Sequence, residues 1–299
     1  MGAFIVGALS LLSNFLTLVS TSWHTIAAFI APTAFFCLYL YLKKKRLIER
    51  LSVASEMKHK ASHLLRDKTY ELMLISGQRA DNNILLSQVT TELENTGREF
   101  VTLISELLTS LSVEQVNVCI KAIVNPRQIV KGTDDWKNIL VYTLCRSPKS
   151  KPRPTKTPKH VPISENTDFL QIMENKFDVV AIPDLRKYDK DLRKVGVIEG
   201  YMNSTRNWYD FYNTTIVAPI RIDEARLGNS DAGYDLLGFL CSDSLSTGAF
   251  PQRNISMYAQ LMLSFGDDLY HYFNQATMIT EKFVSETNTI RQTGDRSND

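Results

Sequence analysis

The longest feature of the hydropathy pattern is an uncharged run near the N-terminus: residues 3–42 contain no Asp, Glu, Lys or Arg. A helix needs about 20 mostly apolar residues to cross a bilayer, so this run can supply two short spans. We expect them at Ala3–Val19 and Thr25–Leu42, with a turn at residues 20–24. The pattern therefore predicts a transmembrane helical hairpin over residues 1–42.

Residues typical of membrane–water interfaces flank these spans. Trp23 lies in the turn, and Lys43, Lys44, Lys45 and Arg46 follow the second span. Aromatic side chains favour the interface, and clustered basic residues favour the cytoplasmic side. We expect a protein of the bacterial inner membrane that contacts lipid through these residues and carries its C-terminal part in the cytoplasm.

The uncharged run is also compatible with other structures. A secretory signal peptide begins with basic residues and is shorter, so it does not fit. A buried soluble hairpin stays open, although the basic cluster after Leu42 would then be accidental. A single span with a re-entrant first half also stays open, because Pro32 interrupts the run.

A helical pattern follows, with no Pro or Gly between Lys43 and Gly77. From Leu47 to Ile75, the spacings alternate between three and four, although two Lys occupy core-like positions. This imperfect heptad pattern predicts a coiled-coil-like helical stalk over residues 43–82 that forms a dimer or larger homo-oligomer. An amphipathic helix packed on its own domain would give the same pattern.

A second helical pattern, residues 83–110, keeps the same rhythm and suits a dimer interface and packing on its own domain equally well. The pattern then becomes mixed. Strands are predicted at residues 116–124, 138–144, 177–182, 214–222 and 236–242, helices at 166–175 and 255–276, and a polar stretch at 186–207. We expect an α+β fold in which the two long helices cover one face of an antiparallel sheet, and a disordered polar tail over residues 277–299.

Three motifs in this part resemble those of GAF domains, relatives of the PAS sensor modules. They are FDVVAIPDL at residues 177–185, TTIVAPI at 214–220 and LGFLCSDS at 237–244. The resemblance covers about residues 83–276 and implies an antiparallel sheet flanked by helices that binds a small molecule or a partner. The cyclic-nucleotide signature of some members is not matched, and neither are the cysteines of the methionine-sulfoxide-reducing members.

Composition and motifs narrow the range of functions that the chain can have. The net charge of +2 gives no argument for nucleic-acid binding, and the four Cys are scattered, which suits a reducing compartment. No P-loop, dinucleotide fingerprint or nucleophile elbow occurs. His59 and His63 share a helical spacing, but no third metal ligand lies near them in the sequence. We expect a non-enzymatic protein without a metal site, and no cofactor is indicated.

The candidate ligand site is an aromatic stretch interleaved with Arg. Its members are Arg186, Tyr188, Arg193, Tyr201, Arg206, Trp208, Tyr209 and Tyr212. Aromatic faces and guanidinium donors together suit an anionic heterocycle such as a nucleotide. Alternatively, Trp208, Phe211 and Tyr212 fill the core beside the strand that begins at Thr214.

The basic, Pro-rich residues 147–160 predict a loop. Such a loop can be solvated, or can contact anionic lipid headgroups or nucleic acid.

Together these features predict a membrane-anchored, non-enzymatic sensor that couples a cytoplasmic GAF-like domain to the membrane helices. The alternative is a membrane-disrupting or pore-type effector triggered by ligand binding, as in bacterial antiphage defence. A third possibility is a protein-docking module without a ligand. Because the sensor-like domain follows the stalk, we expect its output to return through the stalk or pass to another protein.

Overall fold

The computed structural model describes residues 23–78, 82–129, 135–150, 160–174, 177–205, 207–223 and 234–295. The chain divides into two compact units, Met1–Ser52 and Val53–Asp299. The first predicted span, Ala3–Val19, lies outside the described residues.

The described part of the first unit belongs to α2, a helix that spans Trp23–Ser76. The helix continues past Leu42 through the basic cluster, so the second predicted span, Thr25–Leu42, lies within a longer helix. Residues 32–52 are exposed, including Phe35 and Phe36. Among the described residues, no helix has both the length and the hydropathy of a membrane-crossing segment. The hairpin of residues 1–42 stays a prediction.

The second unit is built on a six-stranded antiparallel sheet with the order β3-β2-β1-β6-β5-β4. The strands are β1 (Asn117–Ile129), β2 (Leu140–Arg146), β3 (His160–Pro162), β4 (Val180–Ile182), β5 (Thr214–Asp223) and β6 (Tyr234–Ser244). The five predicted strands are confirmed, and β3 was missed because only three residues in a Pro-rich stretch form it. A Cβ on Gly238 would lie 2.2 Å from the Lys121 carbonyl oxygen, so only Gly permits this β1–β6 approach.

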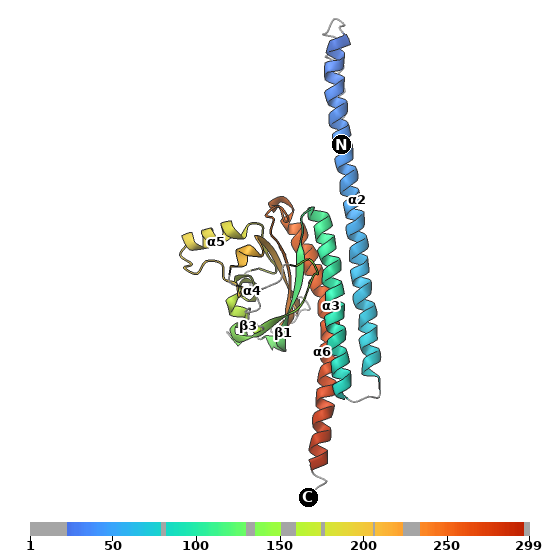
Figure 1. The fold of residues 1–299 in the computed structure, drawn as a ribbon, viewed down its shortest axis with the longest axis vertical. Helices are drawn as coiled ribbons and strands as arrows, with labels where there is room; N and C mark the ends of the chain where they lie inside the picture. Colours follow the sequence, from blue (N-terminus) through green and yellow to red (C-terminus); the bar gives the residue numbers. More distant parts are fainter. Residues whose placement is uncertain are drawn as a thin grey trace. The chain divides into compact units, whose positions relative to one another are not determined.

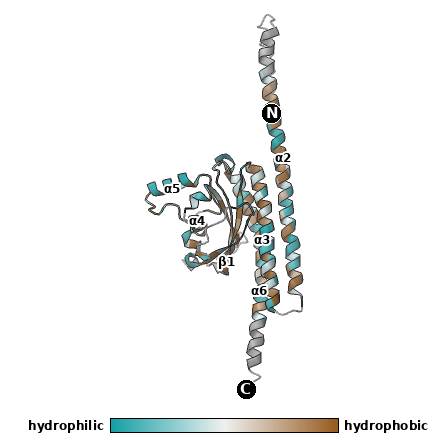
Figure 2. Cartoon of the chain, in the orientation of Figure 1, coloured by the Kyte–Doolittle hydropathy of each residue, from teal (hydrophilic) through white to brown (hydrophobic). Residues whose placement is uncertain are grey.

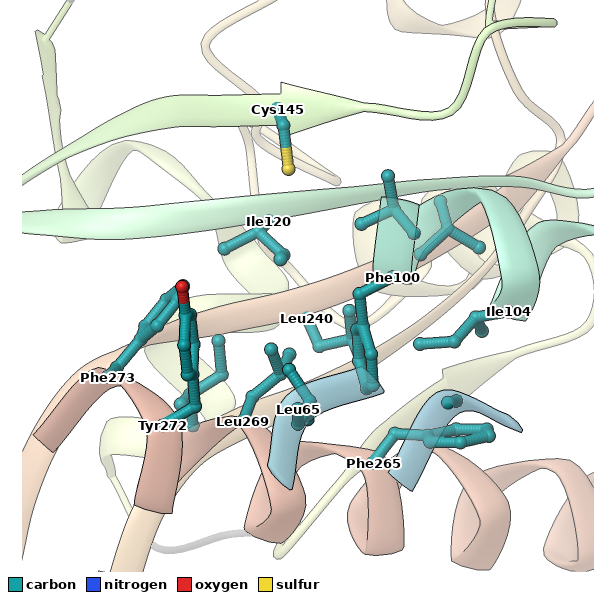
Figure 3. Packing of buried hydrophobic residues seen from close by; sticks show 14 of the residues in the cluster. Leu65, Phe100, Ile104, Ile120, Cys145, Leu240, Phe265, Leu269, Tyr272 and Phe273 are labelled. Atoms are coloured by element: carbon teal, nitrogen blue, oxygen red, sulfur yellow. The ribbon is translucent and has the colours of Figure 1, made fainter. Parts of the chain in front are cut away.

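Two long helices, α3 (Asn82–Ser112) and α6 (Ile255–Asp295), cover one face of the sheet (Figure 1). The rings of Phe100 and Phe265 meet edge to face at 5.7 Å between their centroids. Ile120 and Leu240 project from the central strands into the same helix-side core, which Cys145 also enters (Figure 3). The predicted pairing of these helices on an antiparallel sheet is confirmed.

The part of α2 after Val53 packs on this domain. Ala61, Leu65 and Leu72 are buried in the helix-side core. Lys58 Nζ donates a hydrogen bond of 2.6 Å to Ser264 Oγ, and Ser62 Oγ donates one of 3.1 Å to Asp268 Oδ2. These contacts correct the prediction of a separate stalk over residues 43–82. Spacings of three and four identify an apolar helix face, but they do not say which surface covers it.

The prediction of a disordered tail over residues 277–299 is also corrected, because α6 continues to Asp295. Ile279 and Phe283, one helical turn apart, are buried in the helix-side core. The amide of Asn82 donates a 3.2 Å hydrogen bond to the carbonyl of Phe283. The polar residues around these two side chains concealed the apolar face in the sequence.

The opposite face of the sheet carries α4 (Thr167–Met173) and α5 (Leu185–Lys194). Phe169 stacks on Phe239 of β6 at 4.1 Å between ring centroids. Short 3-10 turns are η1 (Asp135–Asn138), η2 (Ile163–Glu165), η3 (Trp208–Asp210) and η5 (Gln252–Asn254).

The polar stretch at residues 186–207, for which no element was predicted, contains most of α5. Asp184 caps this helix, because its Oδ1 accepts a 2.9 Å hydrogen bond from the backbone N–H of Lys187. Leu185 is its only buried residue, so no apolar period marked the helix in the sequence. Figure 2 shows hydrophilic residues along most of α5.

Candidate ligand site

A small cavity of about 40 Å³ lies on the α4 side of the sheet. The sheet contributes residues of both charge signs and two thiols, and the segments opposite contribute mainly amides and hydroxyls. The lining residues are Cys119, Lys121, Arg146, Asn166, Asp168, Phe169, Asn203, Ser204, Thr205, Tyr212, Thr215, Cys241 and Asp243. This polar cavity, in a domain with two hydrophobic cores, is the candidate ligand site.

Asp168 is the most unusual group in the cavity, because its carboxylate is buried. Its Oδ2 accepts a 3.1 Å hydrogen bond from the Tyr201 hydroxyl, and its Oδ1 accepts one of 3.1 Å from the Phe169 N–H. Burial raises the pKa of Asp168 to about 6, although both hydrogen bonds and nearby Lys121 act in the opposite direction. The carboxylate can therefore gain or lose a proton close to neutral pH.

Backbone contacts fix the segment that faces α4. The Thr167 N–H donates to the Met202 carbonyl at 3.1 Å, and the Met202 N–H donates to Thr167 Oγ1 at 2.8 Å. Gly200 has φ +65, a left-handed conformation that favours glycine. The next N–H, of Tyr201, donates to Asp189 Oδ1 at 2.7 Å. The turn thus directs the Tyr201 side chain toward Asp168.

The sheet side of the cavity supplies charge. Lys121 Nζ donates a 2.8 Å hydrogen bond to Thr143 Oγ1, and Arg146 Nη2 donates one of 3.4 Å to the same oxygen. Asp243 Oδ1 accepts a 3.3 Å hydrogen bond from the Asn117 amide. With Asp168, the lining has two cations and two carboxylates, which suits a small molecule that carries both hydrogen-bond donors and acceptors. Within the described ranges, no group of three or more His, Cys, Asp or Glu could hold a metal ion.

The structure brings four of the predicted aromatic residues together. Ring centroids are 6.5 Å apart for Tyr188 and Tyr201, 5.1 Å for Tyr201 and Trp208, and 6.1 Å for Trp208 and Tyr212. Tyr201 and Tyr212 are buried. The cluster packs on the α4-side core, the buried residues on the α4 side of the sheet that include Phe169, Ile172 and Phe239. Tyr188 also accepts a hydrogen bond from the Gln171 amide. Of the four, only Tyr212 lines the cavity, so the rings mainly contact one another.

Three further predicted site residues, Arg186, Arg193 and Tyr209, do not line the cavity. Arg186 is exposed, donates to Asn213 Oδ1 at 2.9 Å, and lies 6.0 Å from the ring centroid of Tyr209, which is itself exposed. Arg193 donates to the carbonyls of Ile198 and Glu199, both at 2.9 Å, and so holds the turn after α5. Arg206 lies outside the described residues.

The predicted interface residues lie on α2. Lys43, Lys44, Lys45 and Arg46 are exposed, and Lys45 Nζ is 3.9 Å from Glu49 Oε1. Trp23 begins the helix. These positions leave the basic cluster accessible to an anionic surface.

No sequence motif marked Asp168, Lys121 or Arg146 as cavity residues. Asp168 stands in the first turn of α4, where acidic residues are favoured for reasons unrelated to a ligand. Lys121 and Arg146 lie on different strands, and the sheet order brings them together. The one sequence feature that could have indicated this site is Gly200. It is a turn residue directly before Tyr201, whose hydroxyl donates a hydrogen bond to Asp168.

The fold and cavity define an α+β domain with a small polar site on one face of an antiparallel sheet. No protein-family model matches the chain, and no curated protein matches it. Among solved structures, the chain is similar to a GAF sensor protein from Burkholderia vietnamiensis, with 11% identity and a TM-score of 0.37 over 73% of this chain and 98% of that one.

Further similar structures come from other bacteria. The GAF domain of a phosphoenolpyruvate-protein phosphotransferase from Coxiella burnetii has 15% identity and a TM-score of 0.36, over 66% of this chain and 97% of that one. A free methionine-R-sulfoxide reductase from Neisseria meningitidis, in complex with its substrate, has 10% identity and a TM-score of 0.34, over 67% and 95%. At such identities and TM-scores, these likenesses carry no argument about what the chain binds or does.

Proposed function

We propose that the chain is a membrane-anchored sensor whose GAF-like domain binds a small polar molecule in the cavity around Asp168. The observation that carries this proposal is the buried carboxylate within a polar cavity. A buried charge is costly unless neighbours compensate it, so its retention beside a cavity is typical of a binding site. The Tyr201 hydroxyl, held by the Gly200 turn, orients this carboxylate.

The lining indicates the class of ligand. Asp168 suits an N–H or ammonium donor, and Lys121 and Arg146 suit a carboxylate or carbonyl acceptor. A small zwitterion or amide carries both kinds of group. Pockets for drug-sized ligands have volumes of about 300–1,000 Å³. The nucleotide-like ligand predicted from the aromatic stretch is therefore too large for this cavity in its present form.

The proposed anchor is the N-terminal part of the chain. Phe35 is 73% exposed and Phe36 is 55% exposed on α2, and such apolar surface favours lipid or a second copy of the chain. The uncharged run and the basic cluster at residues 43–46 support the same proposal. We place the domain in the cytoplasm of a bacterium, at the inner membrane, and the chain in a homo-oligomer.

The ligand is tested on the full chain purified in detergent. Mass spectrometry of small molecules released on denaturation identifies any bound species, and a panel of zwitterions, amides and nucleotides is screened by thermal unfolding. We expect a panel member to raise the unfolding temperature of the protein.

The Asp168→Asn variant keeps an acceptor for Tyr201 but removes the charge, and we expect at least tenfold weaker binding. Asp67→Asn, at an exposed site on α2, is the matched control and should bind as the unaltered protein does. The proposal fails if no molecule is released and no panel member changes the unfolding temperature.

A further inference from the structure

Two cysteines face each other across the centre of the sheet. Cys119 of β1 is directly opposite Cys241 of β6. The backbone N–H and carbonyl of Val118 both bond to Ser147, on the β2 side, so those of Cys119 face β6. At such a hydrogen-bonded position, opposite Cα atoms are about 5.5 Å apart. Disulfide-linked cysteines have Cα separations of about 4.4–6.8 Å, so the backbone can accommodate a bridge.

The two thiols are also in contact. Cys119 and Cys241 belong to the α4-side core, and a side-chain hydrogen bond joins them. The other cysteines are placed differently. Cys145 points into the helix-side core (Figure 3), and Cys37 is exposed on α2. Among the four cysteines, only this pair combines opposite backbone positions with contacting sulfur groups.

A small oxidant can reach this pair through the cavity. Both thiols line it, and its volume is about 40 Å³. A cavity holds one water molecule when about 10–15 Å³ is available to a water-sized probe, so hydrogen peroxide fits. Buried cysteines are ordinarily inert because they lack thiolate character and access. Here the cavity gives a small oxidant access to the thiols, and the second thiol is available to form a disulfide.

We propose that Cys119 and Cys241 form a reversible disulfide when hydrogen peroxide enters the cavity. One sulfur, as thiolate, attacks a peroxide oxygen, the O–O bond breaks, and the departing oxygen takes a proton and leaves as water. The other sulfur attacks the resulting sulfenic acid, the S–O bond breaks, and a second water leaves. Two thiols and one peroxide give one disulfide and two waters, and a cellular thiol reverses the reaction by exchange.

The surroundings of the two thiols determine the rate of this reaction. The hydrogen bond with Cys119 and burial raise the pKa of the Cys241 thiol, so little thiolate is present at neutral pH. Lys121, which lines the same cavity, acts in the opposite direction. The pair is therefore suited to sustained rather than brief exposure to peroxide. The bridge would tie the first strand of the sheet to the last, which restricts the unfolded chain and raises the unfolding midpoint.

The test uses the full chain in detergent with Cys37→Ser, which removes the exposed thiol and leaves Cys119, Cys145 and Cys241. The protein is treated with hydrogen peroxide, unfolded, and labelled with a mass-tagged maleimide. We expect the number of labelled cysteines to fall from three to one, and to return to three after dithiothreitol. Peptide mapping should find Cys119 linked to Cys241.

Matched variants separate the pair from the remaining thiol. Adding Cys145→Ala removes a buried cysteine on the opposite face of the sheet and should leave the cross-link intact. Adding Cys119→Ala or Cys241→Ala should abolish it. Retention of all three labels after peroxide, a cross-link through Cys145, or sulfinic acid without a cross-link would each overturn the proposal. The cross-link is scored without added ligand, so a negative ligand screen would leave this result standing.

Discussion

At the scale of single residues, Asp168 makes the stability of the domain depend on pH. Its pKa is about 6 in the folded protein, against 3.8 for the free side chain. Between these values the folded protein binds more protons than the unfolded chain, so stability falls as pH rises from about 4 through 6. Burial is the physical cause, because a protonated carboxyl is less costly to bury than a carboxylate.

We therefore expect Asp168→Asn to raise the free energy of unfolding at pH 7.5, by up to about 3 kcal/mol. The gain should vanish near pH 4, where the native carboxyl is protonated as well. Urea unfolding of both proteins at the two pH values measures the effect. An equal difference at pH 4 and pH 7.5 would show that the charge of Asp168 is not its cause.

Gly238 provides a second prediction at this scale. In Gly238→Ala the new Cβ would meet the Lys121 carbonyl oxygen at 2.2 Å, so the central strands must separate. We expect a loss of about 3 kcal/mol in unfolding free energy. Gly77→Ala serves as the control, because its Cβ would lie 3.7 Å from the nearest atom, the Leu74 carbonyl oxygen. Similar stabilities for the two variants would contradict the close approach.

At the scale of elements, the two faces of α2 after Val53 can be compared with one residue type. Leu72 is fully buried, whereas Leu74 is 53% exposed. Leu72→Ala should destabilise the domain by about 2–5 kcal/mol, and Leu74→Ala should change stability by less than about 0.5 kcal/mol. Chemical unfolding measures both. Equal, small effects would mean that this part of α2 does not belong to the folded domain.

The elements also show what sequence patterns can and cannot predict. Alternating or continuous apolar residues predicted β1, β5 and β6, and a helical period predicted α3, because burial itself selects those residues. The pattern failed for α5, which has an Asp184 cap and two ion pairs but only one buried residue. It also assigned the apolar positions of α2 to a partner copy, because periodicity does not show which surface buries an apolar helix face.

The candidate site was less predictable than the fold. The aromatic stretch was prominent in the sequence, and its rings do gather, but they contact one another. The cavity is instead made of common polar residues such as Asn166, Thr215 and Lys121, which come from separate elements. These residues come together through the order of strands in the sheet, and a local sequence pattern contains no information about that order.

At the scale of the whole molecule, we expect the chain to be an integral membrane protein. It should sediment with bacterial membranes, resist extraction by high salt or alkaline carbonate, and dissolve in detergent. Deletion of residues 1–42 should release it into the soluble fraction. Extraction of the full chain by salt alone would instead indicate attachment through the basic residues 43–46.

The role of the anchor is tested by exchanging it. Replacing residues 1–42 with an unrelated two-span anchor should leave ligand binding by the domain unchanged and should not alter the membrane potential. Thermal unfolding with ligand and a voltage-sensitive dye report these two quantities. Depolarisation that ligand triggers in the original chain, and that the exchange abolishes, would favour the pore-type effector.

The placement of β1 beside β6 has a consequence for biosynthesis. These are the first and last strands of the sheet in sequence, yet they are neighbours at its centre. While the chain emerges from the ribosome, β1 can pair with β2 early. It can pair with β6 only when most of the protein has been made. Such distant pairings form slowly. An N-terminal segment that enters a membrane would thus reach it before the domain behind it had folded, and a newly made chain would be tethered there while its sheet was still open.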